Sequence, residues 1–227
     1  MAYKKTIVCL ANSYKPPNGR CIAGREVLAN GYGGWIRPVS DRETAEVSFA
    51  EYRYQNNQGP QILDLVEIPL LRAQPVHHQT ENHVIDTAAH WEKKGQLSWN
   101  QLDAIRDRPA SLWINSDSTS ANDRISQAEA ATVHDSLLLI RPENFSVEVG
   151  RNDWTGRKSF RGAFLYNGRH HNLSVTDPVA RDVFGAKEEG HYPLNDVYLC
   201  ISLTEPYEHD DKCHKLVAAI VSQQPLR

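Results

Sequence analysis

The sequence lacks any long run of apolar residues. Its N-terminal apolar stretch, Thr6–Leu10, is too short for a secretory signal, and no other stretch approaches the length that spans a bilayer. Cysteine is also scarce, and without an export signal such cysteines are expected to be reduced thiols. They are Cys9, Cys21, Cys200 and Cys213. We therefore expect a cytoplasmic chain that makes no contact with a membrane.

Sequence motifs of common catalytic and metal sites are absent as well. There is no Cys-x-x-Cys, no His-Glu-x-x-His, no Gly-x-Ser-x-Gly and no Walker-type or dinucleotide-binding fingerprint. We therefore name no catalytic residue and expect neither a metal nor another cofactor. One alternative stays open, because a histidine-rich stretch could hold a divalent cation, although its spacing matches no standard site. Its members are His77, His78, Glu81, His83, Asp86 and His90.

Neither sign of charge is in large excess over the whole chain. Its 25 Lys and Arg stand against 28 Asp and Glu, and a formal net charge of −3 does not by itself predict a polyanionic partner. Two segments are nevertheless basic. Residues 1–42 carry seven Lys and Arg against two acidic residues, and residues 151–181 carry six against two. If they share a surface they form a basic face, and otherwise they belong to a solvated surface of mixed charge.

What the sequence has in abundance is short β-branched and aromatic runs separated by turn residues. In the first half the expected strands are 6–10, 20–24, 35–39 and 63–71, the last with Pro69 at an edge or a bulge. In the second half they are 137–140, 146–149, 160–166, 169–175, 197–203 and 215–221. Asn167-Gly168 is the strongest hairpin signal. Four or five short strands within about 75 residues fit a small closed barrel, and the similar number of strands in each half favours two of them.

A helical stretch separates the two halves. Ser98–Gln101 has the form of a capping box, and the apolar spacing that follows predicts a helix to Arg106, with a second short helix over Ser126–His134. We therefore predict barrels over residues 1–91 and 132–227 and a helical connector over 92–131. An echo between Trp35–Pro38 and Leu139–Pro142, each closing an apolar strand on Arg-Pro, favours a tandem repeat.

The strand over residues 159–166 has the composition of a base-stacking platform. Phe160, Phe164 and Tyr166 share one face of it, and Arg157, Lys158 and Arg161 lie in or beside it. The alternative, which a closed barrel favours, is that these rings fill the core. In the first half, the turns within residues 11–37 could present cations and backbone N–H groups to phosphate, although ordinary turn chemistry explains their Gly and Asn equally well.

Several blocks also resemble a known family. They are 7–13 (IVCLANS), 19–24 (GRCIAG), 34–40 (GWIRPVS), 63–70 (LDLVEIPL), 81–83 (ENH), 173–178 (LSVTDP) and 215–220 (KLVAAI). Over nearly its whole length the chain resembles the dual-OB-domain family, a family of uncharacterised bacterial proteins. The resemblance implies two OB-like barrels in tandem. It brings no established reaction, so it carries over no catalytic residues.

These observations favour a non-catalytic protein that binds single-stranded DNA or RNA. It would act as an accessory subunit of a nucleic-acid-processing or defence complex, beside a helicase, nuclease or other effector. The residues expected at the interface are Lys15, Arg20, Trp35, Arg37, Trp154, Arg157, Lys158, Phe160, Arg161 and Tyr166. One alternative is a protein-interaction scaffold that does not contact nucleic acid. Another is a metal-dependent enzyme, which predicts that several of Asp64, Glu81, His83 and Asp177 meet in one pocket.

Overall fold

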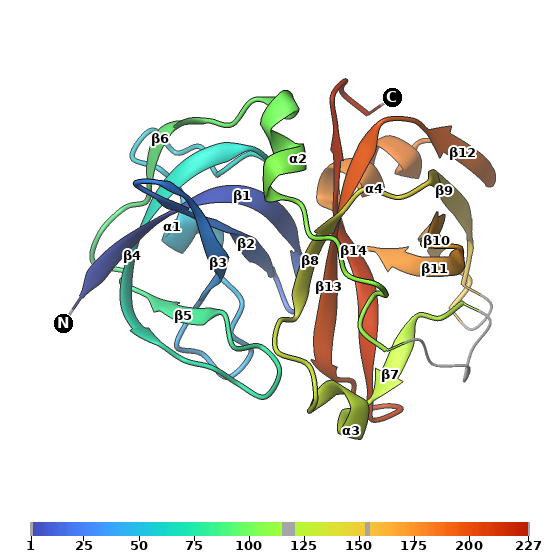
Figure 1. Ribbon diagram of the computed structural model, residues 1–227, viewed down its shortest axis with the longest axis horizontal. Coiled ribbons are helices and arrows are strands. Elements are labelled where there is room, and N and C mark those ends of the chain that lie inside the picture. The colour runs from blue at the N-terminus through green and yellow to red at the C-terminus, as the bar shows by residue number, and fades with distance from the viewer. Residues whose placement is uncertain (1, 115–120, 153–154, 227) are drawn as a thin grey trace. The chain divides into compact units, whose positions relative to one another are not determined.

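The computed structural model of the chain describes residues 2–114, 121–152 and 155–226 (Figure 1). Strands make up 52% of the chain and helices 11%, so the prediction of a mainly β protein is confirmed. Contacts divide the chain into two compact units, Met1–Ile105 and Arg106–Arg227. Among the described residues, no helix is long and apolar enough to cross a bilayer.

The first unit is a barrel that closes where its first strand pairs with its fourth. The barrel strands are β1 (Tyr3–Lys15), β2 (Gly19–Leu28), β3 (Gly31–Val39), β4 (Asp64–Ala73) and β5 (Asn82–Ile85). They pair in the order β1-β2-β3-β5-β4, with β3 and β5 parallel, and β4 pairs back with β1. A further strand, β6 (Glu92–Gln96), pairs with β4, and the short helix α1 (Phe49–Tyr52) falls between β3 and β4 in the chain.

The long first strand of this barrel is bent. Ile7 and Cys9 point into the core, where apolar residues from each of the other barrel strands pack against them. β1 pairs with β4 over residues 3–8 and with β2 over residues 7–15, and its register with β2 shifts between Cys9 and Ala11. Gly24 permits the close approach of β2, because a Cβ there would lie 1.9 Å from the carbonyl oxygen of Val8.

The second unit repeats this strand order, with its first strand broken in two. Its strands are β7 (Arg124–Ser126), β8 (Leu137–Ile140), β9 (Asn144–Arg151), β10 (Lys158–Tyr166), β11 (Arg169–Val175), β12 (Gly190–Leu194), β13 (Val197–Pro206) and β14 (Lys212–Ser222). The path β9-β10-β11-β14-β13 ends on β8, and β11 runs parallel to β14. β8 and β9 together therefore take the place of β1. β12 adds to β9, and β7 adds to β14.

Both units therefore share the topology of a five-stranded Greek-key barrel, which is the architecture of the OB fold. A helix falls between the third and fourth barrel strands in each unit. It is α1 in the first unit and α4 (Pro178–Gly185) in the second. The expectation of two OB-like barrels in tandem is confirmed.

Residues 92–131 contribute strands to both units as well as short helices. Helices η1 (Trp99–Gln101) and α2 (Leu102–Ile105) form the helix that the sequence predicted, and Ser98 makes the expected capping box with Gln101. After β7, helix α3 (Gln127–Ala130) begins at the cap residue Ser126. β6 belongs to the sheet of the first unit and β7 to that of the second.

The Arg-Pro echo does not relate equivalent positions. Arg37-Pro38 lies in β3, the third barrel strand of the first unit, whereas Arg141-Pro142 follows β8, which belongs to the first barrel strand of the second. The use of this echo as a sign of duplication was therefore wrong. The evidence for a repeat is the strand order that the two units have in common.

Candidate nucleic-acid interface

The aromatic row of the second unit points mainly into its barrel. Phe164 and Tyr166 belong to the buried core, and Phe160, at the start of β10, is half-buried against it. This is the core alternative that the sequence left open. Phe160 also faces a cation, because the Arg181 guanidinium lies 5.5 Å from its ring centroid. Trp154 lies outside the described residues.

Two expected interface residues of the first unit are buried. Trp35 is 5% exposed, and the Arg25 guanidinium lies 5.0 Å from its ring centroid. Arg37 is 2% exposed, and its Nη2 lies 3.0 Å from Oε1 of Glu81, which is buried as well. The Arg37 backbone N–H also donates to the Glu81 carbonyl. Arg37 therefore joins β3 to the residue that precedes β5, and its guanidinium is closed to a phosphate.

Two of the three expected cations of the second unit are engaged by their own barrel. Lys158 Nζ donates to the carbonyls of Gly185 and Lys187 at 2.7 and 2.6 Å, at the C-terminal end of α4, where a cation interacts favourably with the helix dipole. Arg161 forms an ion pair with Asp123 at 3.0 Å. Arg157, in the loop between β9 and β10, is exposed and has no ionic partner in the described part of the chain.

In the first hairpin of the first unit, an exposed ring and cations lie together. Tyr14 and Arg20 are register partners across β1 and β2, and the Arg20 guanidinium lies 4.2 Å from the Tyr14 ring centroid. Tyr14 is 44% exposed, and Lys15 follows it at the end of β1. Arg20 has no acidic partner among the described residues. Both cations were expected from the sequence, but Tyr14 was not, and its one signal was its place just before the Pro16-Pro17 turn.

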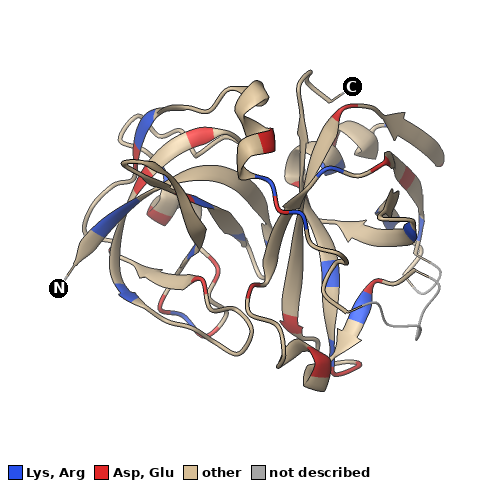
Figure 2. Ribbon diagram, in the orientation of Figure 1, with Lys and Arg blue, Asp and Glu red and all other residues tan. Residues whose placement is uncertain are grey.

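Charges of both signs are interspersed over each unit. Figure 2 shows Lys and Arg (blue) and Asp and Glu (red) at intervals along the ribbon of each barrel. Many of these residues pair with one another, as Lys5 does with Glu26 and Arg124 with Asp210. Within each unit, the basic segments of the sequence therefore give a surface of mixed charge, with exposed cations at particular places.

A group of arginines that the sequence analysis missed surrounds a cavity of about 250 Å³ in the second unit. The lining residues are Arg106, Arg108, Pro109, Arg141, Glu143, Tyr166 and Asn167. Three of them are cations and one is an acid. The acid, Glu143, accepts a hydrogen bond from the backbone N–H of Gly168 at 3.1 Å. We call this cavity the arginine pocket.

Hydrogen bonds fix the walls of the arginine pocket. The backbone N–H of Asp107 donates to the Leu139 carbonyl at 2.7 Å, and the Leu139 N–H donates to Asp107 Oδ2 at 2.8 Å. The Tyr166 hydroxyl and the Asn167 side-chain amide both donate to the Pro109 carbonyl, at 2.9 and 3.1 Å. The segment that carries two of the arginines is therefore held against β8 on one side and against the β10–β11 turn on the other.

The arginines also act electrostatically on the buried phenol. Burial raises the pKa of Tyr166, and so does the negative charge of Asp107, whereas the positive charges of Arg106 and Arg108 act in the opposite direction. Both guanidinium groups and the Asp107 carboxylate therefore lie within electrostatic range of the Tyr166 hydroxyl. The third arginine, Arg141, lies 3.1 Å from Oδ1 of Asp196, and both side chains of this pair are well exposed.

The histidine-rich stretch does not assemble a metal site in the described part of the chain. No group of three or more His, Cys, Asp or Glu there could hold a metal ion. Glu81 pairs with Arg37, and His83 Nδ1 lies 2.6 Å from the Tyr3 hydroxyl. Burial, with the charge of Lys5 as a second cause, lowers the pKa of His83.

The two candidate carboxylates have separate structural partners. Asp64 is buried in the first unit, where it lies 2.6 Å from Lys93 Nζ and accepts a hydrogen bond from the Tyr54 hydroxyl at 3.1 Å. Asp177 caps α4 in the second unit. Its Oδ1 accepts from the first backbone N–H groups of the helix, and its Oδ2 accepts from the backbone N–H of Ile220. Both carboxylates therefore have structural roles, Asp64 as the partner of Lys93 and Asp177 as a helix cap.

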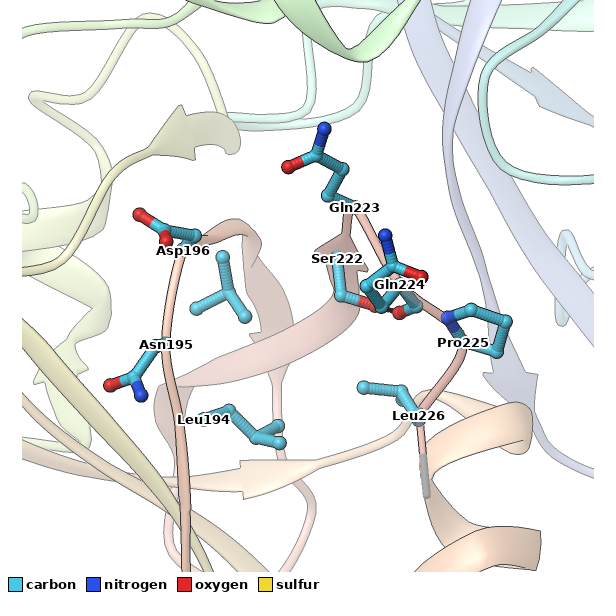
Figure 3. Close-up of a pocket in the computed structure, with 9 residues that line it drawn as sticks. Leu194, Asn195, Asp196, Ser222, Gln223, Gln224, Pro225 and Leu226 are labelled. Atoms are coloured by element: carbon cyan, nitrogen blue, oxygen red, sulfur yellow. Dashed lines mark hydrogen bonds between the residues drawn. The ribbon is translucent and has the colours of Figure 1, made fainter.

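Two further cavities have polar rims. One of about 470 Å³ in the first unit lies between residues 54–58 and 90–93. The other, of about 380 Å³, lies in the second unit between the β12–β13 turn and residues 222–226. Leu194 and Leu226 point toward one another across it (Figure 3). None of its described lining residues is basic, so this cavity does not suit a polyanion.

Comparison with known proteins gives a family for this fold. No curated protein matches the chain. The family described as the dual OB-containing domain matches residues 5–220, which takes in the barrel strands of both units. The match agrees with the two Greek-key barrels and with the resemblance seen in the sequence. The chain therefore belongs to the family of dual OB-containing domains.

Proposed function

We propose that the protein binds single-stranded nucleic acid without catalysis, in support of a helicase, nuclease or other effector. OB barrels bind oligonucleotides or oligosaccharides on their second and third strands and in the loops that join strands one and two and strands four and five. The observation that carries this proposal is the Tyr14–Arg20 pair. It places an exposed ring and a guanidinium together beside the loop between the first and second strands.

This hairpin offers the two kinds of contact that bind single-stranded nucleic acid, namely ring stacking and cations. A half-exposed ring can stack on a base of any sequence, and such stacking contributes about 1–3 kcal/mol per base. Arg20 and Lys15 supply cations for the adjacent phosphates. The Arg20 guanidinium lies over the ring of Tyr14, which holds both groups in place before a strand arrives.

The equivalent loop of the second unit has a similar composition. Arg157 is exposed in the loop between β9 and β10, the first and second barrel strands there. The half-buried Phe160 follows on β10 beneath Arg181. A strand that follows this loop would therefore meet a cation and the edge of a ring, as in the first unit.

Titration of a labelled single-stranded oligonucleotide, followed by fluorescence anisotropy, tests the proposal. Tyr14→Leu is expected to weaken binding about 5- to 150-fold, because it removes about 1–3 kcal/mol of stacking. Arg20→Gln is expected to lower the slope of log affinity against log salt by about 0.7, the value for one phosphate contact on a single strand.

Two exposed residues away from these loops serve as controls. Phe49 is exposed in α1, and Arg72 pairs with Asp41 at the surface of the first unit. Phe49→Leu and Arg72→Gln should bind as the wild type does. No binding by the wild type at low salt would refute the function. Binding that tolerates both hairpin substitutions would refute this assignment of the site.

One observation favours the scaffold alternative. Leu28, a large apolar side chain, is 50% exposed beside the turn of the β2–β3 hairpin. A pull-down of a host protein by the wild type, lost in Leu28→Ser, would support that function. The enzyme alternative has no such support, because Asp64, Glu81 and His83 lie in one unit, Asp177 lies in the other, and each has its own partner.

A further inference from the structure

We infer that the arginine pocket is a binding site for the terminal phosphate of a nucleic-acid strand. This inference rests on the proposed function and adds a second kind of contact to it, at a place none of the expected cations occupies. The pocket is built entirely from described residues of the second unit, and it brings together Arg106, Arg108 and Arg141 around about 250 Å³.

The backbone explains why these guanidinium groups meet. Asp107 is held to Leu139 by two hydrogen bonds, one from its own N–H and one to its carboxylate. One oxygen of its carboxylate is thereby held at β8. Arg106 and Arg108, on either side of Asp107, both line the pocket. In Figure 2 the ribbon that follows α2 shows this red position between two blue ones.

The third arginine is supplied by the break in the first barrel strand. β8 ends at Ile140, and Arg141 occupies the three-residue connection to β9, where no partner strand covers it. Its contact with Asp196 is an exposed ion pair, and such pairs contribute little to stability. An incoming anion can therefore take the place of Asp196 at small cost.

The number of arginines that line the pocket indicates the class of ligand. A terminal phosphate monoester carries a charge of about −1.5 to −2 near neutral pH, and a phosphodiester within a strand carries one negative charge. One arginine suffices for a carboxylate or a diester, whereas convergent guanidinium groups match the several oxygens of a monoester. Three arginines line the pocket, and this number of guanidinium groups favours the monoester.

The test compares 12-nucleotide strands that differ in their ends alone: 5′-phosphate, 3′-phosphate and hydroxyl at both ends. The wild type is expected to bind one of the phosphorylated strands about tenfold more tightly than the hydroxyl-ended strand. Arg108→Gln and Arg141→Gln should each remove that preference while they keep the affinity for the hydroxyl-ended strand. Arg72→Gln should retain the preference. Unchanged melting temperatures would exclude loss of folding, and both pocket side chains are exposed.

The outcomes separate this inference from the proposed function. If all three strands bind equally well, the pocket assignment is refuted and the proposed function stands. If no strand binds but inorganic phosphate raises the melting temperature of the wild type and not of Arg141→Gln, the nucleic-acid end is refuted as the ligand. A phosphoserine peptide that binds as tightly as the phosphorylated strand would refute it too.

Discussion

Replacement of Arg37 with alanine is expected to destabilise the first unit by about 3–5 kcal/mol. Arg37 and Glu81 are both almost fully buried, and their charged atoms lie 3.0 Å apart. Removal of one partner leaves the other as a buried charge without compensation, and this penalty is of that size. For a unit of this length, such a loss lowers the melting temperature by well over 10 °C. Urea unfolding followed by tryptophan fluorescence measures the effect.

The matched control is Arg72→Ala. Arg72 lies in the same unit and also pairs with an acid, Asp41, but both side chains are at least half exposed. An exposed pair contributes about 0–1 kcal/mol, so this variant should unfold close to the wild type. A cost below about 1 kcal/mol for Arg37→Ala would show that Arg37 is not a structural residue, and it would return Arg37 to the candidates for phosphate contact.

Acid is expected to destabilise the second unit through His171. This side chain is fully buried in the barrel, stacked on Phe164 with ring centroids 5.2 Å apart. Burial, with the charge of Lys215 as a second cause, lowers the pKa of His171 to about 4. In the unfolded chain the His171 imidazole has a pKa of about 6.5. Between pH 6.5 and 4 it is therefore protonated in the unfolded chain and neutral in the folded one. The contribution of His171 to the free energy of unfolding is complete above pH 6.5 and is lost as the pH falls toward 4.

The expected loss between pH 7.5 and 4.5 is about 2–3 kcal/mol from this residue. His171→Leu removes the titrating group, so its unfolding free energy should fall by that much less over the same interval. The neighbouring His170 is exposed on the same strand, and His170→Leu should retain the acid sensitivity of the wild type. Equal acid sensitivity in the wild type and in His171→Leu would contradict the prediction.

Local sequence signals predicted most of the strands, because barrel strands alternate and end at recognisable turns. Asn167-Gly168 joins β10 to β11, and its φ angles of 48° and 71° are those of the expected tight hairpin turn. The presence of Pro69 in an expected strand indicated either an edge strand or a β-bulge. It lies in β4, an inner strand that pairs with β1, β5 and β6, beside a register shift between Leu70 and Arg72, so the bulge was the right alternative.

The candidate sites were less predictable, because they depend on contacts between distant residues. The arginine pocket needs Arg106 and Arg141 on adjacent segments, and no local pattern links positions 35 residues apart. The burial of Trp35 and Arg37 likewise depends on distant residues, because Trp35 pairs with Arg25 of β2 and Arg37 with Asn82 of β5. In the sequence, Trp35 and Arg37 follow a glycine-rich turn, and nothing local distinguishes them from an exposed aromatic and an exposed cation. Composition alone therefore could not tell a buried ion pair from a surface contact.

The two appended strands, β6 and β12, affect how the molecule can associate. Each lies at the end of its sheet, where an unprotected backbone invites addition of a strand from another molecule. β6 carries the charged run Glu92–Lys94, and β12 carries Pro193, which has no N–H to offer. Both sheet ends thereby resist growth into fibrils or edge-to-edge dimers.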